Sequence, residues 1–322
     1  MPPADAISAA APRWPGGAKF ALFLSHDVDK IRDRELFYVL AAINHIRRRA
    51  MHGEPGSVRL ALRRLARALV APKPPEMDFQ TILAIEARHG FRSTFFVLHD
   101  VGWRRRGSRY ALTDPALRRI VGMIRAAGGE IGLHGGYYRL NQAAAYRESR
   151  ELLRRELGVE AVGIRNHFLR HTGAETWQAQ EQAGFRYDST FGFSDRVGAR
   201  DARVLPFFPL APGAGEPSGI LELPLTVMDV ALFMKHGPDG RAALAAAWAA
   251  IEPVVAAGGL VTLLWHNDCF NEPEYREWQW TYERLLERLA ALAPWCATGA
   301  EIHDWWRGRA ENGALDGKTE PL

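Results

Sequence analysis

Short apolar runs alternate with amphipathic helical stretches along most of the chain, and this order constrains the fold more than any other feature of the sequence. Runs with the length and composition of strands occur at residues 19–24, 93–98, 130–133, 162–165, 220–225 and 260–265. Between them lie helical stretches, several of which end at a glycine that suits a helix C-cap. Single apolar strands separated by helices are typical of a parallel sheet covered on both faces. The sequence therefore predicts an α/β protein built as a distorted (β/α) barrel.

The same pattern suggests the domain boundaries. We expect a flexible N-terminal segment at residues 1–18, a single barrel domain at 19–309 and a disordered tail at 310–322. Residues 30–77 interrupt the alternation with arginine-rich helical stretches, so we expect a helical insertion after the first strand. Residues 44–68 could make peripheral contact with an anionic membrane or polymer, although a helix packed on the barrel with a solvated basic face is the simpler interpretation.

Composition excludes several classes of protein. Hydrophobic residues make up 47% and charged residues 24% of the chain, as in ordinary globular proteins. Two cysteines cannot build a disulfide framework, and no window offers the roughly 20 apolar residues of a membrane span. The first residues lack a basic leader, so a cytoplasmic location is the expectation. The basic segment has no interleaved aromatics or recognition motif, which argues against nucleic acid as a partner.

Two carboxylates, Asp27 and Asp29, follow the first apolar run directly. In a parallel barrel the carboxyl ends of the strands form the active-site face. Residues two apart on a strand project to the same side, so one carboxylate could bind a metal while the other acts as a base. An isolated pair of this kind would be read as turn and helix-capping residues.

Other predicted strands end in residues of the same chemical kind. His134 ends one strand and is followed by glycines, which allow close approach of the backbone to a ligand. Arg165 ends the next, two residues before His167, and an arginine can hold a catalytic carboxylate in its ionised form. A further strand ends in Trp265 and His266: histidine suits general-acid chemistry, and the tryptophan could stack on a sugar ring.

Taken in this order, the strand ends resemble those of the polysaccharide deacetylases, the carbohydrate esterase family 4 built on the NodB homology domain. The resemblance runs from about Phe20 to Trp306, and the segments 187–190 and 223–229 look like connectors of a divergent bacterial branch. By position, the matching site residues are Asp27 as the base, Asp29 and His134 as metal ligands, Arg165 as the residue that orients the base, and His266 as the general acid. The resemblance implies one divalent metal ion, with zinc as the first candidate.

The chain departs from the family pattern at the metal site. Tyr138 stands where many members have a second metal histidine, and His167 stands in place of the usual proline of the arginine motif. Either His167 or His26 could complete the site, or water could; we assign His167 as the third ligand. We assign Tyr138, Trp265 and Asp268 to substrate binding.

The resemblance implies a metal-dependent hydrolase that removes acetyl groups from an N- or O-acetylated sugar or polysaccharide. Its partner would be an acetylated glycan or sugar precursor, and a lipid-linked or nucleotide-linked precursor would agree with a cytoplasmic location. One alternative is an amidase that acts on a small non-sugar C–N bond. Another is a non-catalytic glycan-binding homologue whose metal site was lost at Tyr138.

Overall fold

The computed structural model describes residues 12, 14–31, 73–100, 106–211, 213, 215–237 and 239–311. Its strands form one parallel sheet in the order β6-β5-β4-β3-β2-β1-β8-β7, and β9 pairs with the start of β1. The strands are β1 Ala21–Val28, β2 Ser93–His99, β3 Glu130–Gly135, β4 Gly163–Asn166, β5 Tyr187–Asp188, β6 Leu221–Glu222, β7 Val227–Met228, β8 Leu260–Leu264 and β9 Trp295–Cys296. Among the described residues β6 and β7 do not pair, so the barrel is curled but open between them.

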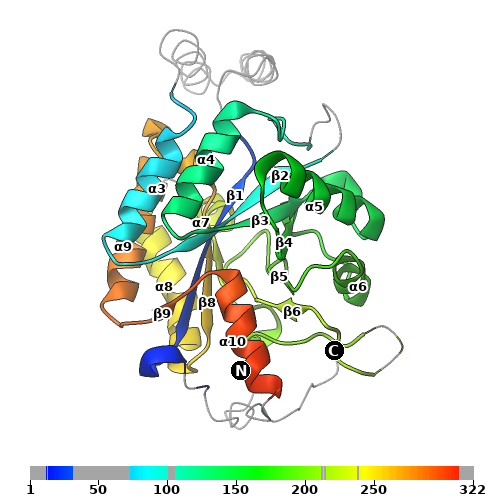
Figure 1. Ribbon diagram of the computed structural model, residues 1–322. Coiled ribbons are helices and arrows are strands. Elements are labelled where there is room, and N and C mark those ends of the chain that lie inside the picture. The colour runs from blue at the N-terminus through cyan, green and yellow to red at the C-terminus, as the bar shows by residue number, and fades with distance from the viewer. Residues whose placement is uncertain are drawn as a thin grey trace, which may run out of the picture.

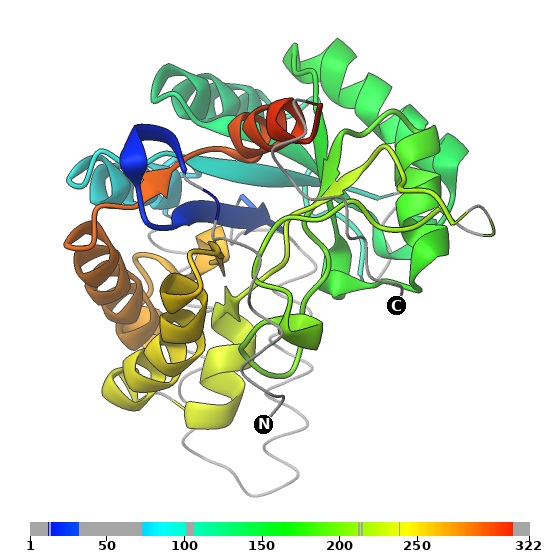
Figure 2. The ribbon, with the colours of Figure 1, turned by 90° about the horizontal axis from the view of Figure 1, so that it is seen from below.

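Helices surround the outer face of the curled sheet (Figure 1; Figure 2). They are α3 Met77–Ala87, α4 Pro115–Ala126, α5 Ala143–Leu157, α6 Ala174–Gln182, α7 Asp229–His236, α8 Gly240–Ala256, α9 Arg276–Ala290 and α10 Gly299–Glu311. Short 3-10 helices follow two strand ends, Tyr137–Arg139 after β3 and His167–Leu169 after β4, and a third at Asn267–Cys269 follows β8. The predicted α/β barrel is therefore confirmed.

Every residue of β1 is buried, because helices cover its outer side and the barrel interior covers its inner side. The interior is filled by large aromatic rings: Tyr187 packs edge-on against Phe23 and Phe96, with centroids 6.4 and 6.5 Å away. Gly163 on β4 makes room for this packing, since a Cβ there would lie 1.9 Å from the Tyr187 ring. The strand cores are thus held rigidly below the strand ends that carry the polar residues.

Two expectations about the sequence boundaries need correction. The segment 1–18 is not flexible throughout, because Trp14 is buried, donates its indole N–H to the Gly258 carbonyl over 2.8 Å and stacks on Trp305. The predicted strand at 220–225 is shorter than expected: β6 ends at Glu222, and the next strand, β7, begins at Val227.

The remaining boundary predictions fall mainly on parts of the chain that the structure does not describe. Most of the insertion at 30–77, including the arginine-rich stretch at 44–68, lies outside the described residues, as do residues 312–322. No helix in the described part of the chain has the length and apolar character needed to span a bilayer.

Candidate active site

The polar residues predicted at the strand ends meet at the carboxyl edge of the sheet. Asp27 lies near the end of β1, with Asp29 just beyond it, and His134 lies on the neighbouring part of β3. The order of the strands decides this meeting, because β2 alone separates β1 from β3, and β4 pairs with β3 so that His134 and Arg165 are direct neighbours. These residues therefore lie at the edge of the sheet where active sites form in such folds.

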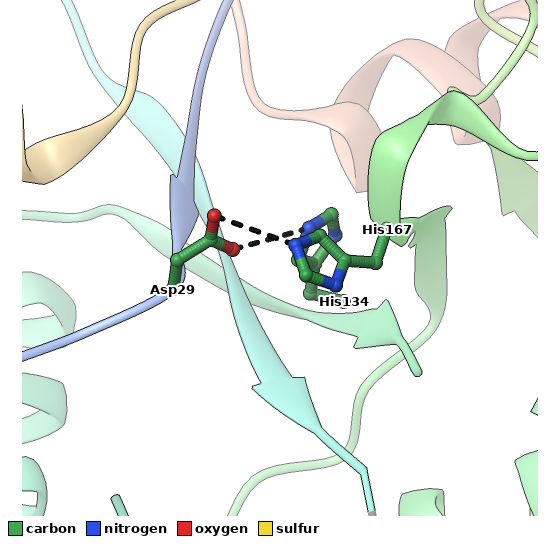
Figure 3. A group of neighbouring side chains, drawn as sticks. All are labelled: Asp29, His134 and His167. Carbon is green, nitrogen blue, oxygen red and sulfur yellow. Dashed lines mark ion pairs between the residues drawn. The ribbon is translucent and has the colours of Figure 1, made fainter. Parts of the chain in front are cut away.

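Asp29, His134 and His167 form a cluster whose ligand atoms all lie within 4.8 Å of one another. Figure 3 shows the carboxylate of Asp29 facing both imidazole rings. Nε2 of His134 lies 3.5 Å from Oδ1 of Asp29, and Nε2 of His167 lies 3.5 Å from Oδ2. Two imidazole nitrogens and one carboxylate form a donor set found in catalytic zinc sites, where the fourth position stays open.

The hydrogen bonding of His134 prepares it for a metal. Its Nδ1 lies 2.9 Å from the backbone carbonyl of Arg165, which can only accept, so Nδ1 carries the hydrogen and Nε2 carries the lone pair. Burial lowers the pKa of His134 to about 4, which keeps the ring neutral at neutral pH. Metal-bound histidines are commonly oriented by this kind of bond to a carbonyl.

Three buried atoms of the cluster have no hydrogen-bond partner among the described residues: Nδ1 of His167, and two atoms that face each other, Nε2 of His134 and Oδ1 of Asp29. Buried polar atoms are nearly always satisfied in folded proteins, and a cation between the two facing atoms would satisfy both. Burial acts to raise the pKa of Asp29, but attraction to His167 outweighs it and holds this pKa well below its ordinary value. The carboxylate is therefore ionised, as a metal ligand must be, and the residues present fit a divalent ion.

Asp27 is held beside this cluster by Arg165. Nη1 of the fully buried Arg165 donates to Oδ1 of Asp27 over 3.1 Å and to Oγ of Ser25 over 2.9 Å. The other guanidinium nitrogens donate to the carbonyl and hydroxyl oxygens of Ser189 over 2.8 and 2.9 Å. Oδ2 of Asp27 then faces Nε2 of His134 at 3.4 Å, so one carboxylate oxygen is fixed and the other is directed at the cluster.

His266 follows β8 and pairs with Asp229, the first residue of α7. Its Nδ1 lies 2.8 Å from Oδ1 of Asp229, and its backbone N–H donates to Oδ2 over 2.7 Å. Burial acts to lower the pKa of His266, but the charge of Asp229 outweighs it, with further contributions from Asp29 and Asp27, and this pKa lies well above its ordinary value. His266 is therefore protonated at neutral pH, and Nε2 takes no part in the pair with Asp229.

The structure decides between the two histidines considered as third ligand. His26 points to the opposite face of β1 from Asp27, because neighbouring residues on a strand alternate in direction. Its Nδ1 lies 2.8 Å from the Trp265 carbonyl and its Nε2 lies 2.8 Å from Oε1 of Glu86. His26 is thus occupied in the wall of the barrel, and His167 is the histidine that joins the cluster.

The residues assigned to substrate binding have different surroundings. Trp265 is wholly buried and packs against Tyr282 at 5.3 Å between ring centroids, so the prediction that it stacks on a sugar is wrong: its ring belongs to the core. Asp268 is partly exposed and forms an ion pair with Lys30 at 3.2 Å. Tyr138 is half-buried, with its ring 5.2 Å from that of Tyr137, and its backbone N–H donates to Oδ2 of Asp100 over 3.1 Å.

Two residues of the site had no role assigned from the sequence. Ser189 fixes the guanidinium of Arg165, and Asp229 fixes His266. Both belong to segments that look like family connectors, and Asp229 directly follows a strand, as the predicted site residues do. That strand, β7, has only two residues, too few for periodicity to reveal it.

Comparison with known proteins was informative only at the level of structure. No protein-family model and no curated protein matches the chain. A Mycobacterium smegmatis protein described as a polysaccharide deacetylase is 20% identical, with a TM-score of 0.57 over 94% of this chain and 95% of that chain. A Pseudomonas aeruginosa protein with the same description is 18% identical, with a TM-score of 0.57 over 92% of this chain and 94% of that chain. The chain therefore has the fold of the polysaccharide deacetylases.

Proposed function

We propose that this protein is a metal-dependent hydrolase that removes acetyl groups from an N- or O-acetylated sugar or polysaccharide. One observation carries the proposal: the free oxygen of Asp27 lies 3.4 Å from Nε2 of His134, the atom that has a lone pair but no hydrogen-bond partner among the described residues. A base therefore stands next to a preformed set of metal ligands. The fold, which is shared with proteins described as polysaccharide deacetylases, supports the choice of an acetylated sugar as substrate.

In this proposal Asp29, His134 and His167 would hold the ion, and zinc is the first candidate for this donor set. A bound divalent ion polarises a carbonyl group and makes water more acidic. Oδ2 of Asp27 takes the proton of the attacking water, while Arg165 keeps the other oxygen, Oδ1, in place. The water oxygen bonds to the acetyl carbon as the base removes its proton.

His266 supplies the proton that the leaving atom of the sugar needs. The pair with Asp229 keeps the ring charged at neutral pH, so it can give a proton to the sugar nitrogen or oxygen as the bond from that atom to the acetyl carbon breaks. The products are acetate and a sugar with a free amine or hydroxyl. Asp229 holds His266 through one hydrogen bond to the ring and one from the backbone N–H, and it neutralises the charge of the ring.

The alternative of a non-catalytic homologue was based on Tyr138 standing in place of a histidine. The cluster does not need a ligand at that position, because His167 lies in reach of Asp29. This geometry favours a working metal site. An amidase that acts on a small non-sugar substrate would use the same residues, so a comparison of substrates must distinguish the amidase from the sugar deacetylase.

The test combines metal content with acetate release. Purified protein is analysed by plasma mass spectrometry beside the variants Asp29→Asn, His134→Ala and His167→Ala, with His89→Ala as a matched control outside the cluster. We expect about one equivalent of a divalent metal, lost in the three variants and kept in the control. Acetate release from acetylated sugars should require that metal and Asp27. Protein that binds metal yet releases no acetate from any acetylated sugar would contradict the proposed reaction.

A further inference from the structure

A group of aromatic and arginine side chains adjoins the candidate metal ligands. We call it the aromatic–arginine cluster, and it consists of Arg106, Tyr137, Phe168 and Arg170. The ring of Phe168 lies 4.4 Å from that of His167 and 5.6 Å from that of Tyr137, between centroids. The contacts thus run from a metal ligand, through Phe168, to Tyr137 and the two arginines. None of these four residues has a part in the reaction described above.

The backbone around Phe168 turns its ring outward. Phe168 and Leu169 both have positive φ, +61° and +49°, which is uncommon for residues other than glycine and costs free energy for bulky side chains. The Phe168 side chain is 54% exposed, whereas Leu169 is 8% exposed and packs in the core with Leu225. A strained turn that presents a large apolar ring to solvent, directly after a candidate metal ligand, is a feature typical of a binding surface.

The chemistry of an exposed aromatic ring suits a sugar. The C–H groups on one face of a pyranose are apolar and slightly positive, and the face of an aromatic ring carries negative charge. Tyr137, which is half-exposed, meets the Phe168 ring at 83°, so the two rings form a corner and not a flat surface. Phe168 is the more exposed ring of the cluster and therefore the one that can receive a partner.

Two arginines add positive charge at this corner. The guanidinium carbon of Arg106 lies 4.3 Å from the Tyr137 centroid and 5.3 Å from that of Phe168, and the guanidinium of Arg170 lies 4.2 Å from Tyr137. Neither forms an ion pair with a carboxylate in the described part of the chain, although Arg170 donates one hydrogen bond to the Tyr137 carbonyl. A guanidinium that stacks through its face keeps N–H groups at its edge for an anion, and its fork matches a carboxylate or a phosphate.

We propose that the aromatic–arginine cluster is a subsite for an anionic sugar: Phe168 stacks on a sugar ring, and Arg106 and Arg170 bind a carboxylate or phosphate group that the substrate carries. This inference rests on the proposed function, because it places the subsite beside the ligands of the acetyl-binding metal. It narrows the substrate class from acetylated sugars in general to acetylated sugars with a negative charge near the acetyl group.

The arrangement also explains why the anion binds at the cluster. Asp27 and Asp29 are carboxylates and would repel an anionic group that came close to them. The Phe168 ring contacts both the His167 ring, at 4.4 Å, and the guanidinium of Arg106, at 5.3 Å, so the arginines attract the anion to a place that adjoins the metal ligands through this ring. The acetyl group and the anionic group of one substrate can then occupy separate environments.

The experiment measures binding by calorimetry to the full chain with its metal in place. The probes are N-acetylglucosamine, which is neutral, N-acetylglucosamine 1-phosphate and N-acetylmuramic acid, which carries a carboxylate. We expect at least one charged probe to bind about tenfold or more tightly than the neutral one, because hydrogen bonds to charged groups are the stronger ones. The better of the two charged probes identifies phosphate or carboxylate as the anionic group.

Variants separate the subsite from direct binding of the anion to the metal. Arg106→Gln, Arg170→Gln and the double variant should lose the preference for the charged probe and keep the affinity for the neutral one, whereas Phe168→Ala should weaken all probes alike. Arg288→Gln is the matched control, because Arg288 also stacks on an aromatic ring, at 3.5 Å from Trp248 on the outer helices α8 and α9. Arg106 is exposed, so its single variant gives a reading even if Arg170→Gln lowers the melting temperature.

The outcomes are distinguishable. Equal binding of charged and neutral probes, a preference that survives in the double variant, or no binding of any probe would overturn the subsite. Arginine-dependent binding of a charged probe without acetate release would support the subsite and contradict the proposed reaction. The opposite result is acetate release from neutral sugars that is unchanged in the double variant, with no preference for a charged probe. It would support the reaction and contradict the subsite.

Discussion

His134 donates its Nδ1 hydrogen to the backbone carbonyl of Arg165 over 2.9 Å, and this bond joins a candidate metal ligand to the residue that holds the candidate base. The two residues are direct partners in the ladder between β3 and β4. The pairing of two strands therefore orients the imidazole, positions the guanidinium and, through it, orients Asp27. Because all three are set by the same rigid sheet, the geometry does not depend on a mobile loop.

The proposed ligand set predicts which residue of the candidate metal site is essential. Replacement of His167 by Asn should weaken metal binding by more than about 100-fold. Loss of a residue that only hydrogen-bonds to a ligand typically weakens metal binding by about 10- to 100-fold, and loss of a ligand itself should have a larger effect. Tyr138→Phe should leave the affinity unchanged, because Asp29, His134 and His167 already supply the three protein ligands of a catalytic zinc site. Competition with a chromophoric chelator measures both affinities. A loss in Tyr138→Phe equal to that in His167→Asn would show that the tyrosine is a ligand.

Asp27→Asn should separate metal binding from catalysis. The amide keeps the shape of the side chain but cannot take a proton from water, and we expect the rate of acetate release to fall by about 10²- to 10⁴-fold. Metal content should stay the same, because Asp27 is not one of the three clustered ligands. Acetate release at the wild-type rate would rule out Asp27 as the base.

The pair of His266 and Asp229 predicts where the reaction rate declines on the alkaline side of its pH profile. The charge of Asp229 contributes most to raising the pKa of His266 against the effect of burial, so the ring stays protonated well above its ordinary range. A general acid must be protonated, and the rate therefore falls only when the pH exceeds this raised pKa.

In Asp229→Asn the charge is lost, the pKa of His266 falls, and the decline in kcat should begin at a lower pH than in the wild type. The profiles of kcat against pH of the two proteins provide the measurement, and thermal unfolding checks that the variant is folded, since Asp229 also accepts a hydrogen bond from the Val230 N–H. Superimposable alkaline limbs would mean that His266 does not set the profile.

His26 offers a contrast with the histidines of the cluster. Its ring forms a buried pair with Glu86, which also accepts hydrogen bonds from Tyr282 and Ser93, each at 2.7 Å. Removal of one partner of such a pair leaves an uncompensated buried charge and costs about 3–5 kcal/mol. His26→Ala should therefore lower the free energy of unfolding by about this amount, measured in urea, and leave the stoichiometry of the metal unchanged. Loss of metal from a folded His26 variant would contradict its placement in the barrel wall.

Some features of the site were beyond the reach of sequence patterns. Asp229 follows a strand too short to show a period, and Trp265 precedes a candidate acid residue yet points into the core. His26 and His167 look equally suitable as residue types. The difference between them is one of direction, since His26 projects from the back of β1 while His167 follows β4 on a 3-10 turn that brings it over Asp29.

The sequence by itself determined the parallel α/β architecture and the residues that stand at the carboxyl ends of the strands, because burial on both faces leaves a continuous apolar run and the first polar residue marks its end. Only the tertiary structure decided which of those residues meet. The order of strands in the sheet places β3 next to β4, with β3 two positions and β4 three positions away from β1. That order arises from long-range packing, and the distances between ligands arise from it in turn, so no local pattern in the chain encodes them.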